Sequence, residues 1–383
     1  MRPDPILFVD HAHALGGAER SLLLLMSHLP GSRWPVHLAC ARGALHAEAT
    51  RRGLPAHIVA LPRLRRSLRF AVDWISKSRA LARLAQDTGA AAIYANTVRA
   101  AFYCSLAARL SRRPLIWHMR DFWLSEEEPS QPAFDSLGKR WLMSAANLVI
   151  TNSSAVAANL PPSQKVKVVH NGIDLREFSG YQGADDFRSA HNLPPQAALV
   201  GMVGRLRPWK GQERFLRVAA RVLESHETAY FLIVGGSPFD TGEAYLTHLK
   251  DLARQMAIAG RLRFTGQLDD VRPALAAMDV FVHPGEPEPF GLVNIEAMAM
   301  GLPVVAFAHG ALPEIVEDGK TGTLVAAGNE PAMARAVCDL LTNPNLRHRM
   351  SEAARDRVAR NFSIERVAND IDSLLQQTLA QRR

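Results

Sequence analysis

Two glutamates eight positions apart lie in the segment EPEPFGLVNIEAMAMGLPVV, residues 286–305. Glu288 sits in a proline-flanked stretch directly after the strand-like run VFVHP, whereas Glu296 falls within a segment of helical composition. Phe290 and Gly291 begin this predicted helix, so one carboxylate precedes the helix and the other lies on its second turn. This spacing allows both carboxylates to flank one bound ligand.

The first backbone N–H groups of this helix, at Gly291, Leu292 and Val293, have no partner within the helix and form a predicted anion site. Carboxylates are poor ligands for phosphate, but they accept hydrogen bonds from hydroxyls. We therefore expect sugar and ribose hydroxyls to be the targets of Glu288 and Glu296. For either glutamate alone, a surface position or a pairing with a neighbouring base remains a reasonable interpretation.

A basic loop, GRLRPWKG at residues 204–211, follows a second strand-like run, ALVGMVG. Its spacing does not match the G-x-x-x-x-G-K-[ST] phosphate loop. It does place Arg205 and Lys210 around a proline-bearing turn, where Arg can grip a phosphate through two N–H groups and Lys adds a point charge. The alternative is an ordinary solvated basic loop.

A glycine pair, Gly16 and Gly17, separates the strand that ends at Asp10 from the helical run AERSLLLLMSHL. Glycines at a helix N-terminus let backbone N–H groups approach an anion closely, and the helix dipole favours negative charge there. A phosphate site and a plain tight turn are both consistent with this pair.

Metal-binding patterns are weak along the chain. His11 and His13 have no evident third ligand. The D-x-D pair of Asp370 and Asp372 falls on the predicted C-terminal helix, far in sequence from the segments above, and we interpret it as a surface feature. We therefore expect no metal and no other cofactor.

Composition indicates a soluble globular protein of two domains. The 383 residues are 48% hydrophobic and 21% charged, and chains of this length ordinarily form more than one core. The purely apolar runs are too short to span a bilayer, and the N-terminus lacks the order of a signal peptide. Three widely spaced cysteines, Cys40, Cys104 and Cys338, fit no zinc site and favour a reducing, cytoplasmic location.

Positive charge is concentrated in the first half of the chain. Residues 1–180 contain 23 Lys and Arg against 13 Asp and Glu, whereas the remainder contains 22 against 24. The segment Arg63–Arg83 carries seven cationic residues, with apolar residues at helical spacing at Leu64, Leu68, Ala71 and Ile75. Such a helix suits an anionic membrane surface, or it packs its apolar stripe on its own domain. Nucleic acid is not expected, because no nucleic-acid-binding motif accompanies the basic patch.

Short apolar runs alternate with helical segments, which is the pattern of parallel α/β sheets. Seven such runs lie in the first half: ILFVD, VHLAC, HIVAL, AAIYAN, PLIWHM, NLVITN and VKVVHN. Six follow a polar interval: ALVGMVG, YFLIVGG, LRFTGQ, VFVHP, PVVAFA and GTLVAA. We expect two doubly wound domains, at 1–178 and 179–364, a linker near 172–196, and a C-terminal helix at 365–383 that packs back on the first domain. Neither first strand is followed by G-x-G-x-x-G, which disfavours a nicotinamide-dependent dehydrogenase.

Taken together, these segments resemble the retaining glycosyltransferases of family 4, which have the GT-B fold. The resemblance rests on the E-x7-E spacing of Glu288 and Glu296, on GRLRPWKG, NGID at 171–174 and GGAER, and on HGALPEIVEDGKTGTLV at 309–325. It covers nearly the whole chain. It implies an α/β protein with two Rossmann-like doubly wound parallel-sheet domains that face a central cleft, the first on the acceptor side and the second for a nucleotide-sugar donor.

The resemblance also implies roles on the donor side. Glu288 would hold hydroxyls of the donor sugar, and Glu296 those of the nucleotide ribose. The backbone near Gln267 and Leu268, in TGQLDDV, would contact the base. The diphosphate would be neutralised by a further set of groups: Arg205, Lys210 and the backbone at Gly17 and at Phe290–Val293.

In the first domain, the resemblance assigns His118, in IWHMRDFW, to contact with the donor sugar. Arg120 and Asp121 are near alternatives for this role. Asn96 and Arg99 are expected on the acceptor side.

The implied reaction is a retaining, metal-independent transfer of a hexosyl-type sugar from a nucleotide diphosphate sugar, with UDP favoured over GDP, to a glycan or lipid-linked acceptor in cell-envelope or polysaccharide synthesis. Cations and a helix N-terminus would stabilise the departing diphosphate. A GT-B epimerase of nucleotide sugars is one alternative, although it would need further acid–base carboxylates. A non-catalytic nucleotide-sugar-binding protein is another, although it would not need His118 and Glu288.

Overall fold

The computed structural model describes residues 3–63, 68–123, 132–236 and 242–381. The chain forms two compact units, unit 1 with Met1–Ile173 and Ile364–Arg383, and unit 2 with Asp174–Ser363. The passage between them therefore lies at Asp174, a few residues before the boundary expected after residue 178. Within the described ranges, no helix combines the length and the apolarity needed to cross a bilayer.

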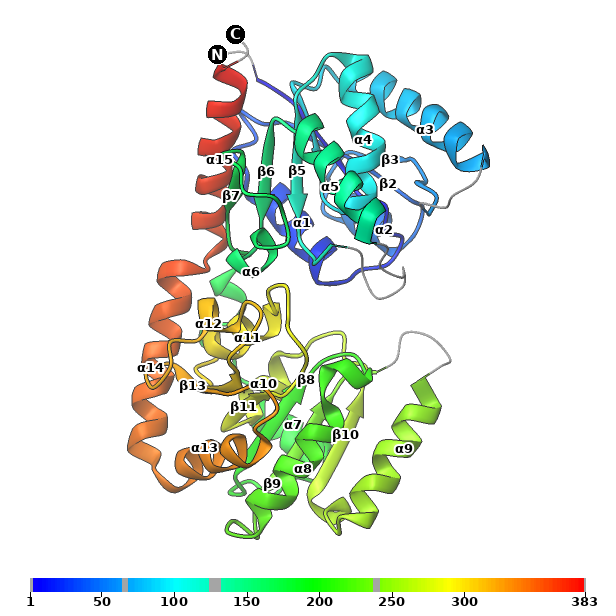
Figure 1. Cartoon of the computed structure of the whole chain (residues 1–383). Coiled ribbons are helices and arrows are strands. Elements are labelled where there is room, and N and C mark those ends of the chain that lie inside the picture. Colours follow the sequence, from blue (N-terminus) through cyan, green and yellow to red (C-terminus); the bar gives the residue numbers. More distant parts are fainter. Residues whose placement is uncertain (1–2, 64–67, 124–131, 237–241, 382–383) are drawn as a thin grey trace. The chain divides into compact units, whose positions relative to one another are not determined.

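Unit 1 is built on a parallel sheet of seven strands in the order β3-β2-β1-β4-β5-β6-β7 (Figure 1). The strands are β1 (Ile6–Val9), β2 (Val36–Cys40), β3 (Ala56–Ile58), β4 (Ala92–Ala95), β5 (Leu115–Met119), β6 (Leu148–Thr151) and β7 (Val166–Val168). They coincide with the seven apolar runs of the first half. Along β1, Ile6 and Phe8 enter one core layer, and Leu7 and Val9 enter the other. Both faces of the sheet are covered, which is why its central strands are apolar throughout.

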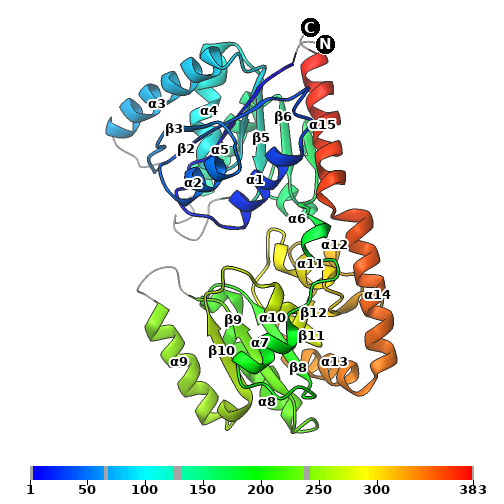
Figure 2. The ribbon, with the colours of Figure 1, turned by 180° about the vertical axis from the view of Figure 1, so that it is seen from behind.

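Helices cover the two faces of this sheet (Figures 1 and 2). One face carries α1 (Gly17–His28), α2 (Ala44–Arg51) and α15 (Ile364–Ala380). The opposite face carries α3 (Leu68–Asp87), α4 (Val98–Ser111) and α5 (Pro132–Ala145), and the short α6 (Ser154–Ala157) follows β6. The layer α3–α4–α5 therefore forms one outer side of unit 1.

The C-terminal helix α15 is attached to the rest of unit 1 by a partly buried ion pair. Asp372 accepts hydrogen bonds from Trp34 Nε1 at 2.6 Å and from Arg33 Nη1 at 2.9 Å. The interpretation of the D-x-D pair as a surface feature is therefore wrong for Asp372, which anchors the helix, whereas Asp370 is exposed.

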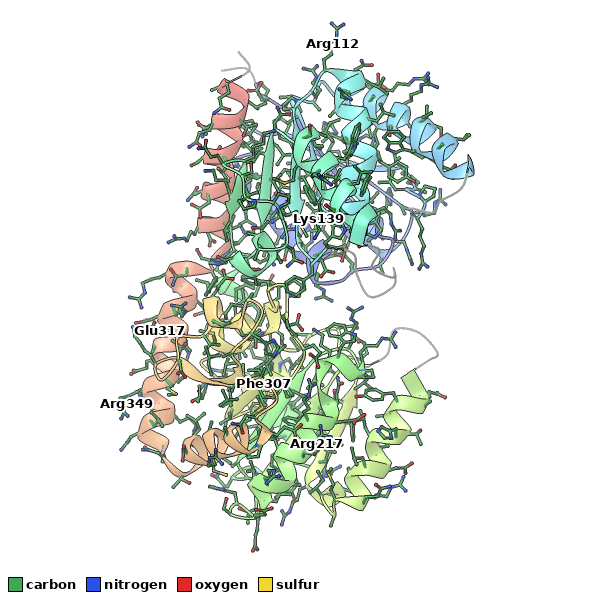
Figure 3. The ribbon with its side chains drawn as sticks, in the orientation of Figure 1. Arg112, Lys139, Arg217, Phe307, Glu317 and Arg349 are labelled. Carbon is green, nitrogen blue, oxygen red and sulfur yellow. The ribbon has the colours of Figure 1, made fainter. Side chains whose placement is uncertain are left out.

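Unit 2 contains a second parallel sheet, in the order β10-β9-β8-β11-β12-β13. Its strands are β8 (Leu199–Val203), β9 (Tyr230–Val234), β10 (Leu262–Gly266), β11 (Val280–His283), β12 (Val304–Phe307) and β13 (Gly322–Val325). Its helices are α7 (Ala184–Ala190), α8 (Gln212–Leu223), α9 (Gly242–Gln255), α10 (Arg272–Ala277), α11 (Leu292–Ala299), α12 (Leu312–Ile315), α13 (Glu330–Thr342) and α14 (Pro344–Asn361), with 3-10 turns η1 (Leu175–Glu177), η2 (Pro208–Lys210) and η3 (Ala259–Arg261). Helices α8, α9 and α13 share one core layer, where Arg217 of α8 pairs with Glu330 of α13 at 2.8 Å (Figure 3).

The segment expected as a linker near 172–196 is part of unit 2 for most of its length. It forms η1 and α7, and α7 packs on α10. Phe187 is buried, and Arg188 Nη2 donates to the carbonyl oxygen of Ala277 at 2.6 Å. The polar composition of this segment concealed the two side chains that attach it.

Strand order reverses beside the first strand of each sheet, between β1 and β4 in unit 1 and between β8 and β11 in unit 2. In α/β proteins, ligands bind at the carboxyl ends of the strands at such a point. The segments that the sequence analysis selected, DHAHALGG, GRLRPWKG and PGEPEPFG, leave β1, β8 and β11 respectively.

Candidate functional site

The loops that leave β8 and β11 pack against each other in unit 2. The N–H of Glu286 donates to the carbonyl oxygen of Trp209 at 2.7 Å. Gly211 has a φ of 80°, and a Cβ there would lie 2.3 Å from the carbonyl oxygen of Pro284. Only glycine tolerates this approach. Gly211, the last residue of GRLRPWKG, thus allows the basic loop to lie beside the segment that contains Glu288.

Lys210 and Glu288 form an ion pair where these loops meet. Glu288 is only 6% exposed, and its Oε1, which Lys210 contacts, also lies 3.4 Å from Nε2 of His283 at the end of β11. Burial raises the pKa of Glu288, but the hydrogen bond with His283 and the charge of Lys210 outweigh it and lower the pKa to about 2. Glu288 is therefore a buried carboxylate that stays ionised at neutral pH.

Both cations of the loop lie near the indole of Trp209. Lys210 Nζ is 4.3 Å from the ring centroid, and the Arg205 guanidinium carbon is 5.8 Å from it. Cation–π attraction favours these positions of the two cations near the ring. The buried Gln212 fixes the backbone as well, because its Nε2 donates to the carbonyl oxygen of Arg205 at 2.9 Å. The structure thus brings Arg205 and Lys210 together, as the sequence predicted.

Helix α11 starts beside Glu288. Gly291 is its N-cap, and a Cβ there would lie 3.6 Å from Cβ of Glu288. Phe290 is buried, with its ring in edge-to-face contact with Phe362 at 6.0 Å. Glu296 lies half-buried on the second turn of α11. The helix register therefore agrees with the one predicted.

The loop after β12 closes against the backbone of Glu288, a contact that the sequence analysis did not foresee. The N–H of Ala311 donates to the carbonyl oxygen of Glu288 at 3.0 Å. Gly310 has a φ of 57°, and a Cβ there would lie 2.6 Å from the same oxygen. His309 is adjacent, and burial together with the neighbouring His283 lowers its pKa. The backbone of Glu288 is thus fixed by a third loop.

The segment after β10, with Gln267 and Leu268, lies at the same edge of the sheet. A Cβ on Gly236, which follows β9, would lie 3.1 Å from the backbone N of Gln267. The carbonyl oxygen of Gly236 in turn accepts from the N–H of Leu206 at 3.1 Å. Backbone contacts therefore connect the segment expected to contact a base with the basic loop.

Unit 1 contains a chain of buried polar side chains at the carboxyl ends of β1, β4 and β5. Asn96 Nδ2 donates to Asp10 Oδ2 at 2.6 Å, and Arg120 Nε donates to Asn96 Oδ1 at 2.5 Å. Arg120 Nη1 donates a further hydrogen bond to Asn171 Oδ1 at 2.6 Å. None of the four residues is more than 7% exposed. Such connected networks hold their members rigidly.

His118 lies inside β5, as its place in the run PLIWHM predicted, and it is 1% exposed. Its Nδ1 is 2.5 Å from the hydroxyl of Tyr94. Burial and then the charge of Arg120 hold the pKa of His118 well below its usual value, so the ring is neutral. The assignment of His118 to a donor sugar stays a prediction. Of its alternatives, Arg120 belongs to the buried network, and Asp121 is exposed with its carboxylate accepting from the N–H of the next residue.

Gly16 is the N-cap of α1, and Gly17 is the first residue of the helix. The N–H of Gly16 donates to Oε2 of Glu19 at 2.8 Å. The side chain of Glu19, on the same helix, therefore already binds the backbone N–H of Gly16 that was a candidate for binding phosphate. Burial and the neighbouring Asp10 raise the pKa of Glu19 to about 7.

Arg99, which was expected on the acceptor side, lies half-buried in the first turn of α4.

The described part of the chain contains no group of three His, Cys, Asp or Glu side chains placed to hold a metal ion. His11 Nδ1 instead contacts Thr97 Oγ1 at 2.8 Å, and His13 is exposed.

Several members of these clusters were missed by sequence reasoning: Asp10, Glu19, Tyr94, Asn171, Gln212, His283 and His309. Glu19, Asn171 and His309 lie within the motifs GGAER, NGID and HGALPEIVEDGKTGTLV, to which the resemblance was traced, although no role was assigned to them. Two others had a signal of a different kind. Asp10 and His283 are polar residues at the ends of the apolar runs ILFVD and VFVHP, where a parallel strand meets its ligand-binding edge.

Two sequence profiles match the chain. "Glycosyltransferase Family 4" matches residues 15–177, and "Glycosyl transferases group 1" matches residues 184–357. D-inositol 3-phosphate glycosyltransferase 2 of Catenulispora acidiphila is 37% identical over 242 residues, which are 60% of this chain and 55% of that protein. The lipopolysaccharide core biosynthesis mannosyltransferase LpcC of Rhizobium leguminosarum bv. viciae is 31% identical over 244 residues, 64% of this chain and 68% of the relative. The chain thus spans little more than half the length of the inositol-phosphate relative.

Solved structures agree with the fold along nearly the whole chain. Anabaena HepE (Alr3699) in complex with UDP is 25% identical with a TM-score of 0.85, over 97% of this chain and 100% of that chain. Sucrose-phosphate synthase from Thermosynechococcus elongatus is 22% identical with a TM-score of 0.83, over 99% of this chain and 100% of that one. The prediction of two Rossmann-like domains with the GT-B fold is confirmed.

Proposed function

Because the chain belongs to the glycosyltransferases of family 4, with a group 1 glycosyl transferase domain in its second half, we propose that it transfers a hexosyl-type sugar from a nucleotide diphosphate sugar to a glycan or lipid-linked acceptor. The observation that carries this proposal is the cluster of Arg205, Lys210 and Glu288 at the carboxyl ends of β8 and β11. Two cations suit a diphosphate, and an ionised carboxylate next to them suits sugar hydroxyls.

UDP is the nucleotide that we favour, with GDP as the alternative. HepE, at 25% identity, has been solved with UDP and with UDP and glucose. In this chain Glu296 would hold the ribose and the backbone near Gln267 and Leu268 the base. The relatives act, by their names, on D-inositol 3-phosphate and in lipopolysaccharide core biosynthesis, which supports an acceptor in polysaccharide or envelope synthesis.

Transfer would proceed with retention of configuration and without a metal ion. The bond from the sugar to the β-phosphate would break as charge develops on the phosphate. Arg205, Lys210 and the start of α11, at the carboxyl ends of β8 and β11, would stabilise this charge. The departing phosphate would accept the proton of the acceptor hydroxyl while the new glycosidic bond forms on the same face. Turnover in millimolar EDTA tests the metal-free step: the rate should stay near that of the untreated enzyme. A loss that only Mg²⁺ or Mn²⁺ restores would contradict it.

The proposal has one more part, which is peripheral association of the protein with an anionic membrane at the cytoplasmic face. The outer side of α3, α4 and α5 supports it. Helix α4 lies between its neighbours, because Trp74 Nε1 of α3 donates to the carbonyl oxygen of Phe102 at 2.8 Å and Trp141 Nε1 of α5 donates to Ser105 Oγ at 3.2 Å. Large apolar side chains are exposed on this layer, which we call the α3–α5 face: Val72, Ile75, Leu110, Leu137 and Trp141.

Cations accompany these apolar residues. Arg112 ends α4 and Lys139 lies on α5 (Figure 3), while Arg79 and Arg83 are exposed on α3. The segment predicted to bind a membrane was Arg63–Arg83, of which residues 64–67 lie outside the described residues. Ala71 and Ile75 are exposed, whereas α3 packs inward through Leu81, Ala82 and Ala85. A surface with exposed Trp and Leu among cations suits adsorption to anionic lipid.

Thermal stabilisation by a panel of nucleotides and nucleotide sugars tests the donor assignment. A ligand at 100 times its Kd adds about 2.7 kcal/mol to the stability of the state that binds it. UDP and at least one UDP-sugar should stabilise the protein, whereas uridine should stabilise it much less. Equal effects of uridine and UDP would contradict the assignment of the cations to the diphosphate.

A further inference from the structure

Glu288 has two basic partners that differ in mobility. Its Oε1 contacts both Lys210 Nζ and His283 Nε2. Lys210 reaches the carboxylate on a flexible four-carbon stem from η2, whereas His283 ends β11 and is 5% exposed. The backbone of Glu288 is fixed by Ala311. Of the three side chains, Lys210 is therefore the one that can turn to another anion.

The proposed function gives Lys210 such an anion, the diphosphate of the donor. When Lys210 turns to it, the 6% exposed carboxylate of Glu288 loses its cationic partner. A buried charge without a partner is strongly unfavourable. His283 is then the partner that the described residues offer to Glu288.

We propose that His283 is a positioning residue for the donor site: as the diphosphate engages Lys210, the imidazole of His283 takes up a proton from solvent and becomes the cationic partner of Glu288. The balance of this step is one imidazole and one proton giving one imidazolium, with no other bond changed. Glu288 thereby stays ionised and aligned with the donor sugar. This inference rests on the proposed function and adds that donor binding is linked to proton uptake.

The charged and titratable groups near His283 come from three loops and one helix. Glu288 and Lys210 are its main neighbours, from the segments after β11 and β8. Glu286, near His309, is ion-paired with Arg214 of α8. His309 lies in the loop after β12, and burial together with His283 lowers its pKa.

Calorimetry measures the linked proton directly. UDP and UDP-glucose are titrated into the protein near pH 7.5 in phosphate, HEPES and Tris, and the slope of the apparent enthalpy against the ionisation enthalpy of the buffer gives the protons taken up. We expect an uptake of roughly 0.3–1 proton for the wild type, since histidine is the side chain that titrates in this range. His283→Gln should abolish it, and His348→Gln, an exposed control on α14, should not change it. Equal uptake by the wild type and His283→Gln overturns the proposal, as does no uptake by the wild type.

A second measurement needs no donor and keeps His283 in place. Lys210→Met removes the cation that competes for Glu288, so the NMR titration midpoint of His283 should rise relative to the wild type in protein without nucleotide. An unchanged midpoint overturns the inference but leaves the proposed function standing. A raised midpoint in a protein that binds no nucleotide sugar would instead contradict the proposed function while supporting the coupling of His283 to Glu288.

Discussion

Lys210 and Glu288, 78 positions apart in the sequence, form an ion pair between the loops that leave β8 and β11. Their side chains are 17% and 8% exposed, so the pair is largely removed from solvent. Lys210 is assigned to the diphosphate and Glu288 to the sugar. With these proposed roles, the bond between sugar and phosphate that breaks in the reaction would lie next to this pair.

Replacing either cation by alanine should weaken binding of UDP much more than binding of uridine. Each charged hydrogen bond to phosphate contributes about 1.5–3 kcal/mol, so Arg205→Ala and Lys210→Ala should each lower UDP affinity by roughly 10- to 150-fold. Calorimetric titration of both ligands measures the effect. Arg349→Ala, exposed on α14, is the control (Figure 3). An equal loss for UDP and uridine would mean that the loop does not bind the diphosphate.

The two glutamates should separate binding from turnover. Glu296→Gln should weaken binding of free UDP, because the proposed target of Glu296 is the ribose. Glu288→Gln should leave UDP affinity within a few-fold and slow turnover by about 10²-fold or more, because its target exists only on the sugar. Affinity from titration and kcat from UDP release test this. The reverse pattern would exchange the two roles.

Glu288 should also affect the acid stability of the protein. Its pKa in the folded protein is about 2, below the usual value of 4.5. A lowered folded-state pKa contributes stability that is fully present above pH 4.5 and is lost as the pH falls toward 2. Glu288→Gln should therefore be less stable than the wild type near pH 6, by about 3 kcal/mol at most, with a gap that closes toward pH 2.

Urea unfolding at several pH values measures that gap. Glu352→Gln, an exposed glutamate on α14, controls for the loss of an ordinary carboxylate. A gap between Glu288→Gln and the wild type that stays constant with pH would show that Glu288 does not titrate in this range.

The α3–α5 face should bind vesicles that contain anionic lipid. Each juxtamembrane cation contributes about 1 kcal/mol near such a surface, so binding should fall at high salt. Leu137→Ser with Trp141→Ser should reduce co-sedimentation several-fold, and Arg140→Glu should reduce it as well. Arg349→Glu in unit 2 serves as the charge control. Absence of binding at low salt would end this part of the proposal.

The sheets were predictable because their central strands are buried on both faces. Each apolar run, from ILFVD to GTLVAA, corresponds to one strand of the structure. The prediction of a linker was wrong for a physical reason. Phe187 and Arg188 attach α7 to unit 2, and these two side chains do not alter the polar composition of the segment.

The candidate site was predictable in part. Residues in loops after parallel strands converge whatever their separation in sequence, which is why Arg205, Lys210 and Glu288 could be grouped in advance. The partners inside strands could not. His118 lies against Tyr94 of another strand, and no spacing in the sequence specifies such a pair. The end of a strand marked His283 as a candidate, but not its contact with Glu288 five residues later.

The release of nucleoside diphosphate from UDP-, GDP- and ADP-sugars tests the central claim most directly, with and without added glycan and lipid-linked acceptors. We predict that the wild type releases diphosphate from at least one of these donors, that UDP-sugars are preferred, and that Lys210→Ala and Glu288→Gln each reduce the rate by at least about 10-fold. Release from none of the donors under any of these conditions, or release that neither substitution slows, would contradict the account.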